Sequence, residues 1–434
     1  MTDVGQESEV LSPVELSDHD LAMLAGEDGE AARLAMRIVV KMAAIQRAPR
    51  LIDISHVHVG GSIYTGAGSL AVIERLIELG AQVRVPTTLN AISVDRAHGM
   101  EVGVDPEFTA NGERLATALE KMGARPTFSC TPYVFPHGPR LGEDILWAES
   151  NAIVYANSVI GARTNRHGDF LDVCAAITGR VPYSGLHLPE NRKGDFLFRV
   201  PAVADPDPSF FTTLGYLVGK HAGTDVPVID GLIGTPSTEA LKSFSSTVAT
   251  AGAVGLFHMV GITPEAPTLE AAFGGRQPKR ILEVTNDALR TVWEQFSTGV
   301  GDHLQLVLMG SPHATLGDFV ELAALVAGRV KHPGVDFLIT TSRFVEEQAR
   351  QQGLLDPIET FGARISTDRC LCMLNEQMLQ PGTEGVMTNS GKFAHYGPGL
   401  IRRGVYFGSA ADCVDSAVAG KPQLGEPEWL SLRH

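Results

Sequence analysis

The chain has 434 residues and a formal net charge of −15, from 50 acidic and 35 basic residues. At this length we expect two or three α/β lobes with a cleft between them rather than one small core. No run of Lys and Arg is long enough to follow a phosphate backbone, so nucleic acid is not an expected partner.

Residues 1–28 are polar and acidic, and we expect them to form a flexible N-terminal extension ahead of a folded region over 29–434. No basic residue followed by an apolar run occurs there, so we expect no secretory signal and a cytoplasmic location. The longest uncharged stretch, residues 243–264, is diluted by Ser, Thr and Gly. It is therefore typical of a buried helix and strand, and no membrane contact is expected.

After the extension, helical and strand-like segments alternate. Helices are predicted over 30–46, 68–80, 113–123 and 170–177, and strands over 51–54, 81–86, 127–135, 226–233, 254–262, 304–309 and 335–341. This alternation predicts a multi-lobed α/β fold, with parallel sheets wrapped by helices around a central cleft. Tentative lobes are 29–220 together with 385–434, and 221–384.

Two histidines follow the first predicted strand, within residues 55–62. His56 and His58 are one strand repeat apart, so their side chains share a face. A shared face would let them act together on a ligand. Taken alone, these residues favour the ordinary alternative, in which one His is a satisfied interior residue and the other caps a loop.

Hydroxyl, amide and carboxylate groups gather at the ends of four further elements, in residues 86–90, 147–151, 157–166 and 388–392. Such groups at element ends can hold a small polar ligand. Arg163 and Arg166 suit a carboxylate, because each guanidinium presents a planar fork of donors. Surface arginines at a solvated helix end explain this pair equally well.

The five cysteines are Cys130, Cys174, Cys370, Cys372 and Cys413. Their scatter through a long chain argues against a disulfide framework. Their spacing resembles neither ferredoxin nor zinc sites, and by itself it favours buried inert thiols. Cys174 lies inside a predicted helix and is expected to be a small core residue.

Together these motifs resemble the aconitase X family over residues 51–417. The most specific stretches are 56–66, 86–95, 129–133, 147–169, 388–396 and 407–417. The resemblance implies an aconitase-like fold and an iron-sulfur hydro-lyase, with the cluster, either 2Fe-2S or 4Fe-4S, held by Cys130, Cys370 and Cys413. Cys372 could replace one of these ligands, because strand alternation places it on the same face as Cys370, but it ranks below the other three.

The family resemblance implies one of two substrates, cis-3-hydroxy-L-proline, giving pyrroline-2-carboxylate, or mevalonate 5-phosphate. We expect the first, because no second anion pocket is evident apart from residues 163–166. A small swivelling-domain subunit is expected to supply the catalytic Ser. Gly60 and Arg369 depart from the family pattern, which has Asp and Thr at these positions, and this leaves the exact substrate open.

Dehydration needs a Lewis acid for the leaving hydroxyl and cations for charge that spreads onto a carboxylate. Three cysteine ligands would leave an iron site open for that hydroxyl. The expected catalytic residues are His56, His58, Glu149 and Lys392. The expected substrate-binding residues are Ser62, Thr88, Asn90, Asn151, Ser158, Arg163, Thr164, Arg166 and Ser390.

Two rival functions belong to other classes. Residues 66–71 fit the G-x-G-x-x-A pattern of an NAD-dependent oxidoreductase, but the next predicted strand ends in Arg84-Val85-Pro86 without the acidic residue that binds ribose. Alternatively, Gly60 and Arg369 are compatible with a non-catalytic binding subunit that has lost the cluster.

Overall fold

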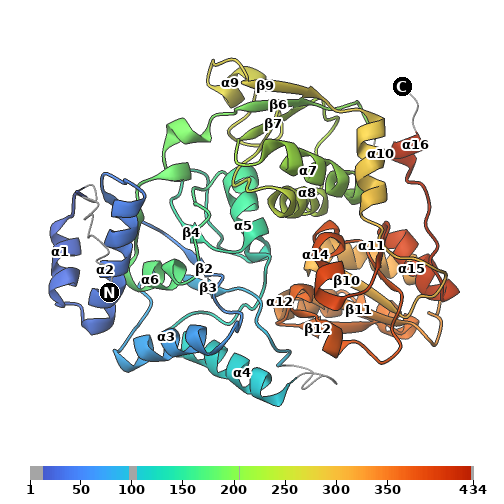
Figure 1. The fold of residues 1–434 in the computed structure, drawn as a ribbon, viewed down its shortest axis with the longest axis horizontal. Coiled ribbons are helices and arrows are strands. Elements are labelled where there is room, and N and C mark those ends of the chain that lie inside the picture. The colour runs from blue at the N-terminus through green and yellow to red at the C-terminus, as the bar shows by residue number, and fades with distance from the viewer. Residues whose placement is uncertain (1–12, 97–104, 205, 432–434) are drawn as a thin grey trace, which may run out of the picture.

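The structure, a computed structural model, describes residues 13–96, 105–204 and 206–431. Three large hydrophobic clusters divide these residues into three units (Figure 1). The clusters extend over residues 23–181, 154–296 and 304–417, and the second also includes residues near the C-terminus. The second cluster combines residues 196–218 with residues 222–296, which the tentative lobes assign to different lobes.

The first unit begins with helices α1 (Asp18–Ala25) and α2 (Glu30–Ile45). Helix α1 lies inside the segment that we expected to be an extension, whose residues 1–12 lie outside the described part of the chain. Ser17 caps α1 through a reciprocal capping box with Asp20. Asp20 is fully buried and accepts hydrogen bonds from Arg180 at 2.8 and 3.0 Å, which anchors the helix.

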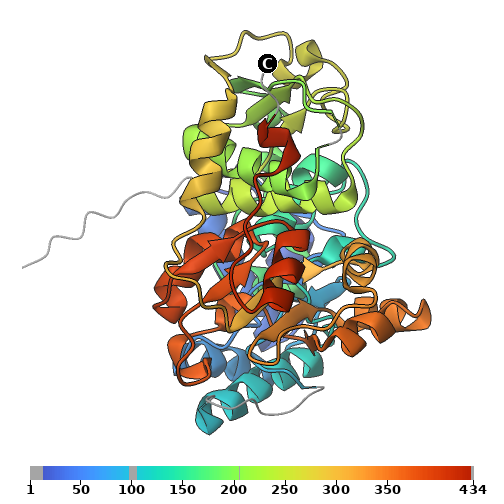
Figure 2. The ribbon, with the colours of Figure 1, turned by 90° about the vertical axis from the view of Figure 1, so that its right-hand side faces the viewer.

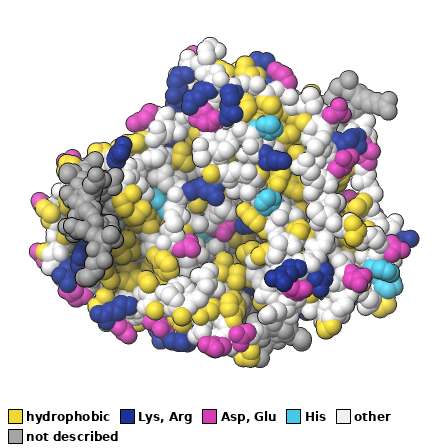
Figure 3. Space-filling view, viewed as in Figure 1, with side chains coloured by type: hydrophobic (Ala, Val, Ile, Leu, Met, Phe, Trp, Pro, Cys, Tyr) yellow, Lys and Arg dark blue, Asp and Glu magenta, His cyan; other side chains and the backbone are white. Residues whose placement is uncertain are grey.

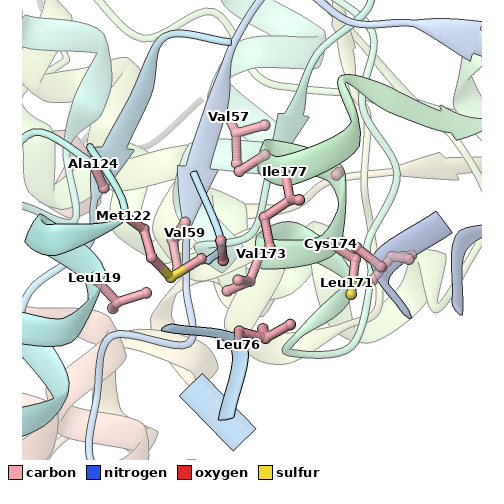
Figure 4. Close-up of a cluster of buried hydrophobic side chains, with 14 of the residues drawn as sticks. Val57, Val59, Leu76, Leu119, Met122, Ala124, Leu171, Val173, Cys174 and Ile177 are labelled. Atoms are coloured by element: carbon pink, nitrogen blue, oxygen red, sulfur yellow. The ribbon is translucent and has the colours of Figure 1, made fainter. Parts of the chain in front are cut away.

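A parallel sheet in the order β3-β2-β4 lies at the centre of the first unit. Its strands are β2 (Val57–Val59), β3 (Thr87–Leu89) and β4 (Leu146–Trp147), and β1 (Leu51–Asp53) pairs antiparallel with β5 (Arg180–Pro182). Helices α3 (Ala67–Glu78), α4 (Pro106–Lys121) and α6 (Leu171–Thr178) complete the core. Figure 4 shows Val57 of β2 beside Ile177 and Val59 between Met122 and Val173, with Cys174 in the same cluster.

Two predicted strands of this unit are not strands. In residues 81–86, the amides of Val83 and Arg84 donate to the carbonyls of Met122 and Ala176, near the ends of helices, rather than to a neighbouring strand. Residues 127–135 form a single strand-like bond, from Ser129 to Leu89, before a 3-10 turn, η1 (Pro132–Val134). The turn occurs because proline cannot donate to a strand ladder.

The second unit contains a parallel sheet in the order β8-β7-β6-β9. The strands are β6 (Phe196–Arg199), β7 (Pro227–Asp230), β8 (His258–Met259) and β9 (Arg280–Glu283), and the helices are α7 (Pro208–Ala222), α8 (Thr238–Ala251), α9 (Leu269–Phe273) and α10 (Asn286–Gln295). Glycine lets α7 and α8 touch, since a Cβ at Gly215 would lie 2.7 Å from the carbonyl oxygen of Phe244. Helix α16 (Glu428–Ser431) lies beside α10 (Figure 2).

The third unit is a five-stranded parallel sheet in the order β12-β11-β10-β13-β14. Its strands are β10 (Leu306–Ala314), β11 (Asp336–Thr341), β12 (Arg364–Thr367), β13 (Val386–Thr388) and β14 (Val405–Phe407), and its helices are α11 (Leu316–Val326), α12 (Arg343–Gln351), α13 (Leu355–Phe361), α14 (Gly391–Ile401) and α15 (Ala410–Ala419). Strand order reverses between β10 and β13, and ligands bind at such switch points beyond the carboxyl ends of strands.

The carboxyl edge of this sheet meets the first unit. Ile92, after β3, forms a bridge with Arg369, after β12, and the amide of Ile92 donates to the carbonyl of Asp368 at 2.7 Å. The predicted α/β architecture of parallel sheets covered by helices is confirmed. No helix in the described ranges is both long and apolar enough to cross a membrane. On the face shown in Figure 3, basic and acidic side chains are intermixed.

Candidate active site

Three thiols come together where the first and third units meet. Cys130 precedes η1, Cys370 follows β12, and Cys372 lies in the 3-10 turn η5 (Leu371–Met373). The thiols of Cys130 and Cys372 donate to Cys370 and hold the pKa of Cys370 well below its ordinary value. Cys370 is thus the group in this cluster that most readily exists as a thiolate. In the described residues, no three His, Cys, Asp or Glu side chains form a site for a single metal ion.

Cys413 lies apart from these thiols. It is fully buried in α15, among Met387, Val414 and Ala417 in the hydrophobic cluster of the third unit. The capping box at Ser409 fixes the start of this helix and turns Cys413 toward the core. The expected grouping of Cys130, Cys370 and Cys413 therefore does not match the structure, in which Cys372 is the third thiol.

A buried ion pair lies beside the thiols. Lys392, in the first turn of α14, donates to Oε1 of Glu149 at the end of β4, over 3.0 Å. Asn90 and Asn151 also donate to this carboxylate, each at 3.1 Å. Burial raises the pKa of Glu149, but Lys392 outweighs that effect and the net shift is downward.

Lys392 is charged for the complementary reason. Burial lowers the pKa of its ammonium, but Glu149 and then the thiols of Cys370, Cys372 and Cys130 raise it to a greater extent. The site therefore contains a fixed cation and a fixed anion next to the sulfur atoms. Such preorganised charges can stabilise charge that develops in a bound molecule.

The two predicted histidines both flank the ring of Trp147, with centroid distances of 5.9 and 6.0 Å. His56 accepts a hydrogen bond from the Trp147 indole at 3.0 Å, and burial lowers its pKa to about 4. His58 is fully buried, its Nδ1 lies 2.8 Å from the hydroxyl of Thr88, and burial lowers its pKa to about 3. Both imidazoles are therefore neutral at pH 7, and Nε2 of His58 lacks a partner among the described residues.

Further predicted residues surround this group and fix its loops. Ser62 donates to the carbonyls of Asn90 and Ala91 at 3.0 and 3.2 Å. Asn151 donates to the carbonyl of Cys130 at 2.9 Å, and so links Glu149 to the thiols. Ser390 caps α14 and donates to the carbonyl of Ser311, which fixes the first turn of the helix, where Lys392 lies.

Among the described residues, the remaining predicted side chains form no hydrogen bond with the thiols, Glu149 or Lys392; these are Ser158, Arg163, Thr164 and Arg166. Helix α5 (Ser150–Tyr155) and the π-helix η2 (Ala156–Ile160) follow Glu149, and the chain then returns alongside β4, where the amide of Ile145 donates to the carbonyl of Arg163. Arg163 forms a bridge with Asp144, which precedes β4, whereas Glu149 follows that strand. Arg166 is exposed and donates weakly to the carbonyls of Gly252 and Val254 at 3.3 and 3.4 Å.

The hydroxyls of Ser158 and Thr164 are also engaged in structural contacts. Ser158 accepts from the amide of Phe257 at 2.8 Å, and Thr164 accepts from the amide of Trp147 at 3.1 Å. These contacts join the first unit to the second and hold β4. The segment from 158 to 166 thus supports the fold around the site.

Two residues of the site escaped the sequence analysis. His313, at the end of β10, donates its amide to the sulfur of Cys130 at 3.2 Å. Asp172 accepts the amides of Gly60 and Gly61 at 2.7 and 3.2 Å and so holds the loop after β2. No motif marks either residue, and the position of His313 after a long apolar strand is its only signal.

Close packing of two loops explains why position 60 is a glycine. A Cβ there would lie 2.9 Å from the Cβ of Ala148, so only glycine lets the loop after β2 approach the loop that carries Glu149. The departure at this position is therefore compatible with close packing around the site.

Comparison with known proteins gives matches along most of the chain. Family models described as the first, second and third domains of aconitase X match residues 13–190, 194–294 and 304–419, respectively. The cis-3-hydroxy-L-proline dehydratase of Pseudomonas aeruginosa is 49% identical over 417 residues, which cover 96% of this chain and 72% of that protein.

More distant relatives include archaeal proteins. The phosphomevalonate dehydratase large subunit of Methanothermobacter thermautotrophicus is 35% identical, and the alignment covers 87% of this chain and 92% of that subunit. The crystal structure of the holo-form of aconitase X from Thermococcus kodakaraensis superposes with a TM-score of 0.83 at 32% identity, over 93% of this chain and 100% of that one.

Proposed function

Because the chain belongs to the aconitase X family, we propose that it is a hydro-lyase that dehydrates cis-3-hydroxy-L-proline with the help of an iron-sulfur cluster. The observation that carries this proposal is the grouping of Cys130, Cys370 and Cys372 beside the Lys392–Glu149 pair. The 49% identity to a protein named for this reaction supports the choice of substrate.

The donor set suits such a cluster. Cys130 and Cys370 are buried, Cys370 touches both other thiols, and its lowered pKa favours the thiolate that iron binds. We propose these three cysteines as the sulfur ligands, with Cys372 replacing Cys413. When bound, the cluster would supply an iron that takes the leaving hydroxyl as a Lewis acid.

The chain's own charged side chains would assist removal of the proton beside the substrate carboxylate. Loss of the proton beside the carboxylate spreads negative charge onto that carboxylate, and the ammonium of Lys392 is the fixed cation beside the thiols. Glu149, held by Asn90 and Asn151, would accept a hydrogen bond from the ring nitrogen of the substrate. His58 would hydrogen-bond the hydroxyl through Nε2.

The balance of atoms is that of a simple elimination. The C2 proton and the C3 hydroxyl of the substrate leave as water, and the resulting enamine tautomerises to pyrroline-2-carboxylate. The base that takes the C2 proton is proposed to be a Ser on a small swivelling-domain subunit. That proposal is supported by the name "large subunit" of the archaeal relatives.

Dehydration of mevalonate 5-phosphate is the second candidate, supported by the archaeal relatives. A phosphate would need further cations, and the contacts of Arg163 and Arg166 in the described residues are a backbone bridge to Asp144 and weak bonds to backbone carbonyls of the second unit. This placement favours the proline substrate. Neither the NAD-dependent oxidoreductase nor the non-catalytic subunit is supported by relatives that are named dehydratases.

The test is co-expression of the chain with its candidate small subunit, followed by anaerobic reconstitution, iron analysis and assays on both substrates. We expect bound iron, visible absorption and water loss from cis-3-hydroxy-L-proline only. Colourless protein without iron would contradict the cofactor, and turnover of mevalonate 5-phosphate alone would contradict the substrate.

A further inference from the structure

A buried histidine next to the thiols has one ring nitrogen that no group of the described chain satisfies. His313 is fully buried, and its Nδ1 has no hydrogen-bond partner among the described residues. An unsatisfied buried polar atom costs free energy and needs an explanation. Here the atom lies in the only part of the described chain where three thiols meet.

The other ring nitrogen determines which tautomer is present. Nε2 of His313 lies 2.8 Å from the carbonyl oxygen of Arg369, and a carbonyl can only accept a hydrogen bond. Nε2 therefore carries the proton, and Nδ1 presents a lone pair. Histidines that bind metals have this arrangement, in which the non-ligating nitrogen donates to a backbone carbonyl and orients the ring.

The same residue is tied to both halves of the thiol cluster. Its amide donates to the sulfur of Cys130 at 3.2 Å, and its ring bonds to the residue that immediately precedes Cys370. The backbone and the ring of His313 are thus fixed relative to the two buried cysteines. His313 is therefore held beside both buried cysteines, with Nδ1 left without a partner among the described residues.

Building on the proposed function, we propose that His313 is a nitrogen ligand, through Nδ1, of the iron-sulfur cluster that the cysteines hold in the absence of substrate. It would occupy the coordination position that the cysteines leave open, and the substrate hydroxyl would displace it. Imidazole in place of thiolate is a known form of cluster ligation, and it raises the reduction potential because a neutral ligand replaces an anion. Mixed sulfur and nitrogen ligation would distinguish this cluster from one held by cysteines alone.

The chain contains a matched control for this inference. His258, in β8 of the second unit, is also buried, its Nε2 lies 2.7 Å from the carbonyl of Arg192, and its Nδ1 lacks a partner among the described residues. Among the described residues, the groups that interact electrostatically with His258 are Arg192, Glu265 and Lys193 and include no thiol, whereas the amide of His313 donates to Cys130. Loss of a buried imidazole can therefore be separated from loss of a ligand.

The experiment compares the reconstituted wild-type protein with the variants His313→Gln, His313→Cys and His258→Gln. Glutamine can still donate to the backbone carbonyl but has no imidazole lone pair, and cysteine replaces nitrogen with sulfur. Iron content, pulsed electron paramagnetic resonance of the reduced cluster and its reduction potential are measured, with ¹⁵N-labelled histidine to identify the nitrogen.

We expect a strong nitrogen hyperfine coupling in the wild type and in His258→Gln, and its loss in both His313 variants. His313→Cys should keep its iron and show a lower reduction potential, whereas His313→Gln should lose iron. A wild-type cluster without histidine coupling, or with coupling that survives in His313→Cys, would overturn this inference alone. A wild-type protein that binds no iron would instead overturn the proposed cofactor, and this inference with it.

Discussion

The ammonium of Lys392 lies 3.0 Å from a carboxylate oxygen of Glu149, and this bond joins the third unit to the first. Both side chains are nearly buried, with 11% and 13% of their surface exposed. Charges as buried as these are stable only together, because each would otherwise lose its hydration without compensation.

Replacing Lys392 with Met should therefore affect both activity and stability. We expect kcat to fall by about 10²–10³, as for the loss of one preorganised charge in a water-excluded site. The free energy of unfolding should fall by about 3–5 kcal/mol, because Glu149 is left buried and unpaired. Steady-state kinetics and urea denaturation measure the two effects.

The double variant Lys392→Met with Glu149→Gln separates these effects. Removing both charges should restore most of the stability, because neutral groups of similar size replace the pair. Activity should stay low. Recovery of activity together with stability would show that the pair is only a structural element.

The loop after β2 gives a second prediction. Gly60→Ala should destabilise the protein by about 1–3 kcal/mol and reduce activity, because the added methyl group must push away the loop that carries Glu149. Gly68→Ala is the control, since a Cβ at Gly68 in α3 meets no atom within 4 Å. Equal thermal midpoints for the two variants would contradict the close approach at position 60.

Arg166 provides a test of which arginines contact the substrate. The structure gives it only weak contacts with backbone carbonyls of the second unit. Arg166→Ala should therefore leave KM for cis-3-hydroxy-L-proline unchanged, whereas Lys392→Met should change the kinetics. A rise in KM of tenfold or more in Arg166→Ala would return this arginine to the substrate site.

The buried pair between Asp20 and Arg180 predicts a dependence of stability on pH. Burial raises the pKa of Asp20, but the hydrogen bonds from Arg180 and Ser17 outweigh it and lower the pKa overall. Because the pKa of Asp20 is lower in the folded than in the unfolded state, ionised Asp20 stabilises the fold at pH values above the unfolded-state pKa of about 3.9. This stabilisation is lost as the pH falls through the folded-state pKa.

Thermal midpoints between pH 7 and pH 3 test this dependence in the wild type and in Asp20→Asn. The variant should be less stable at pH 7, and the difference should shrink below about pH 4 as the wild-type carboxylate takes up a proton. A difference that stays constant over this range would show that the charge of Asp20 has no role in holding α1.

The alternation of helices and strands was enough to predict the parallel α/β architecture. Helices and strands each give apolar residues a characteristic spacing, which can be recognised in the local sequence. The polar segments around Asn90, Glu149 and Lys392 were also recognisable, since they follow buried strands whose carboxyl ends meet. Helix α1 was missed, because its stability depends on Asp20 reaching Arg180, which is 160 residues away.

The choice between Cys372 and Cys413 could not be made from the sequence. Both lie near the end of a strand, and only the start of α15 at Ser409 turns Cys413 toward the hydrophobic core. The contacts of Arg166 could not be predicted either, because its partners, the carbonyls of Gly252 and Val254, lie more than 80 residues away in the sequence.

The central claim is that Cys130, Cys370 and Cys372 hold an iron-sulfur cluster. The most direct measurement is the iron content and visible absorption of anaerobically reconstituted Cys→Ser variants at these three positions and at Cys413. We predict that Cys130→Ser, Cys370→Ser and Cys372→Ser lose iron and colour, while Cys413→Ser keeps both. Loss of the cluster in Cys413→Ser with retention in Cys372→Ser would contradict the account.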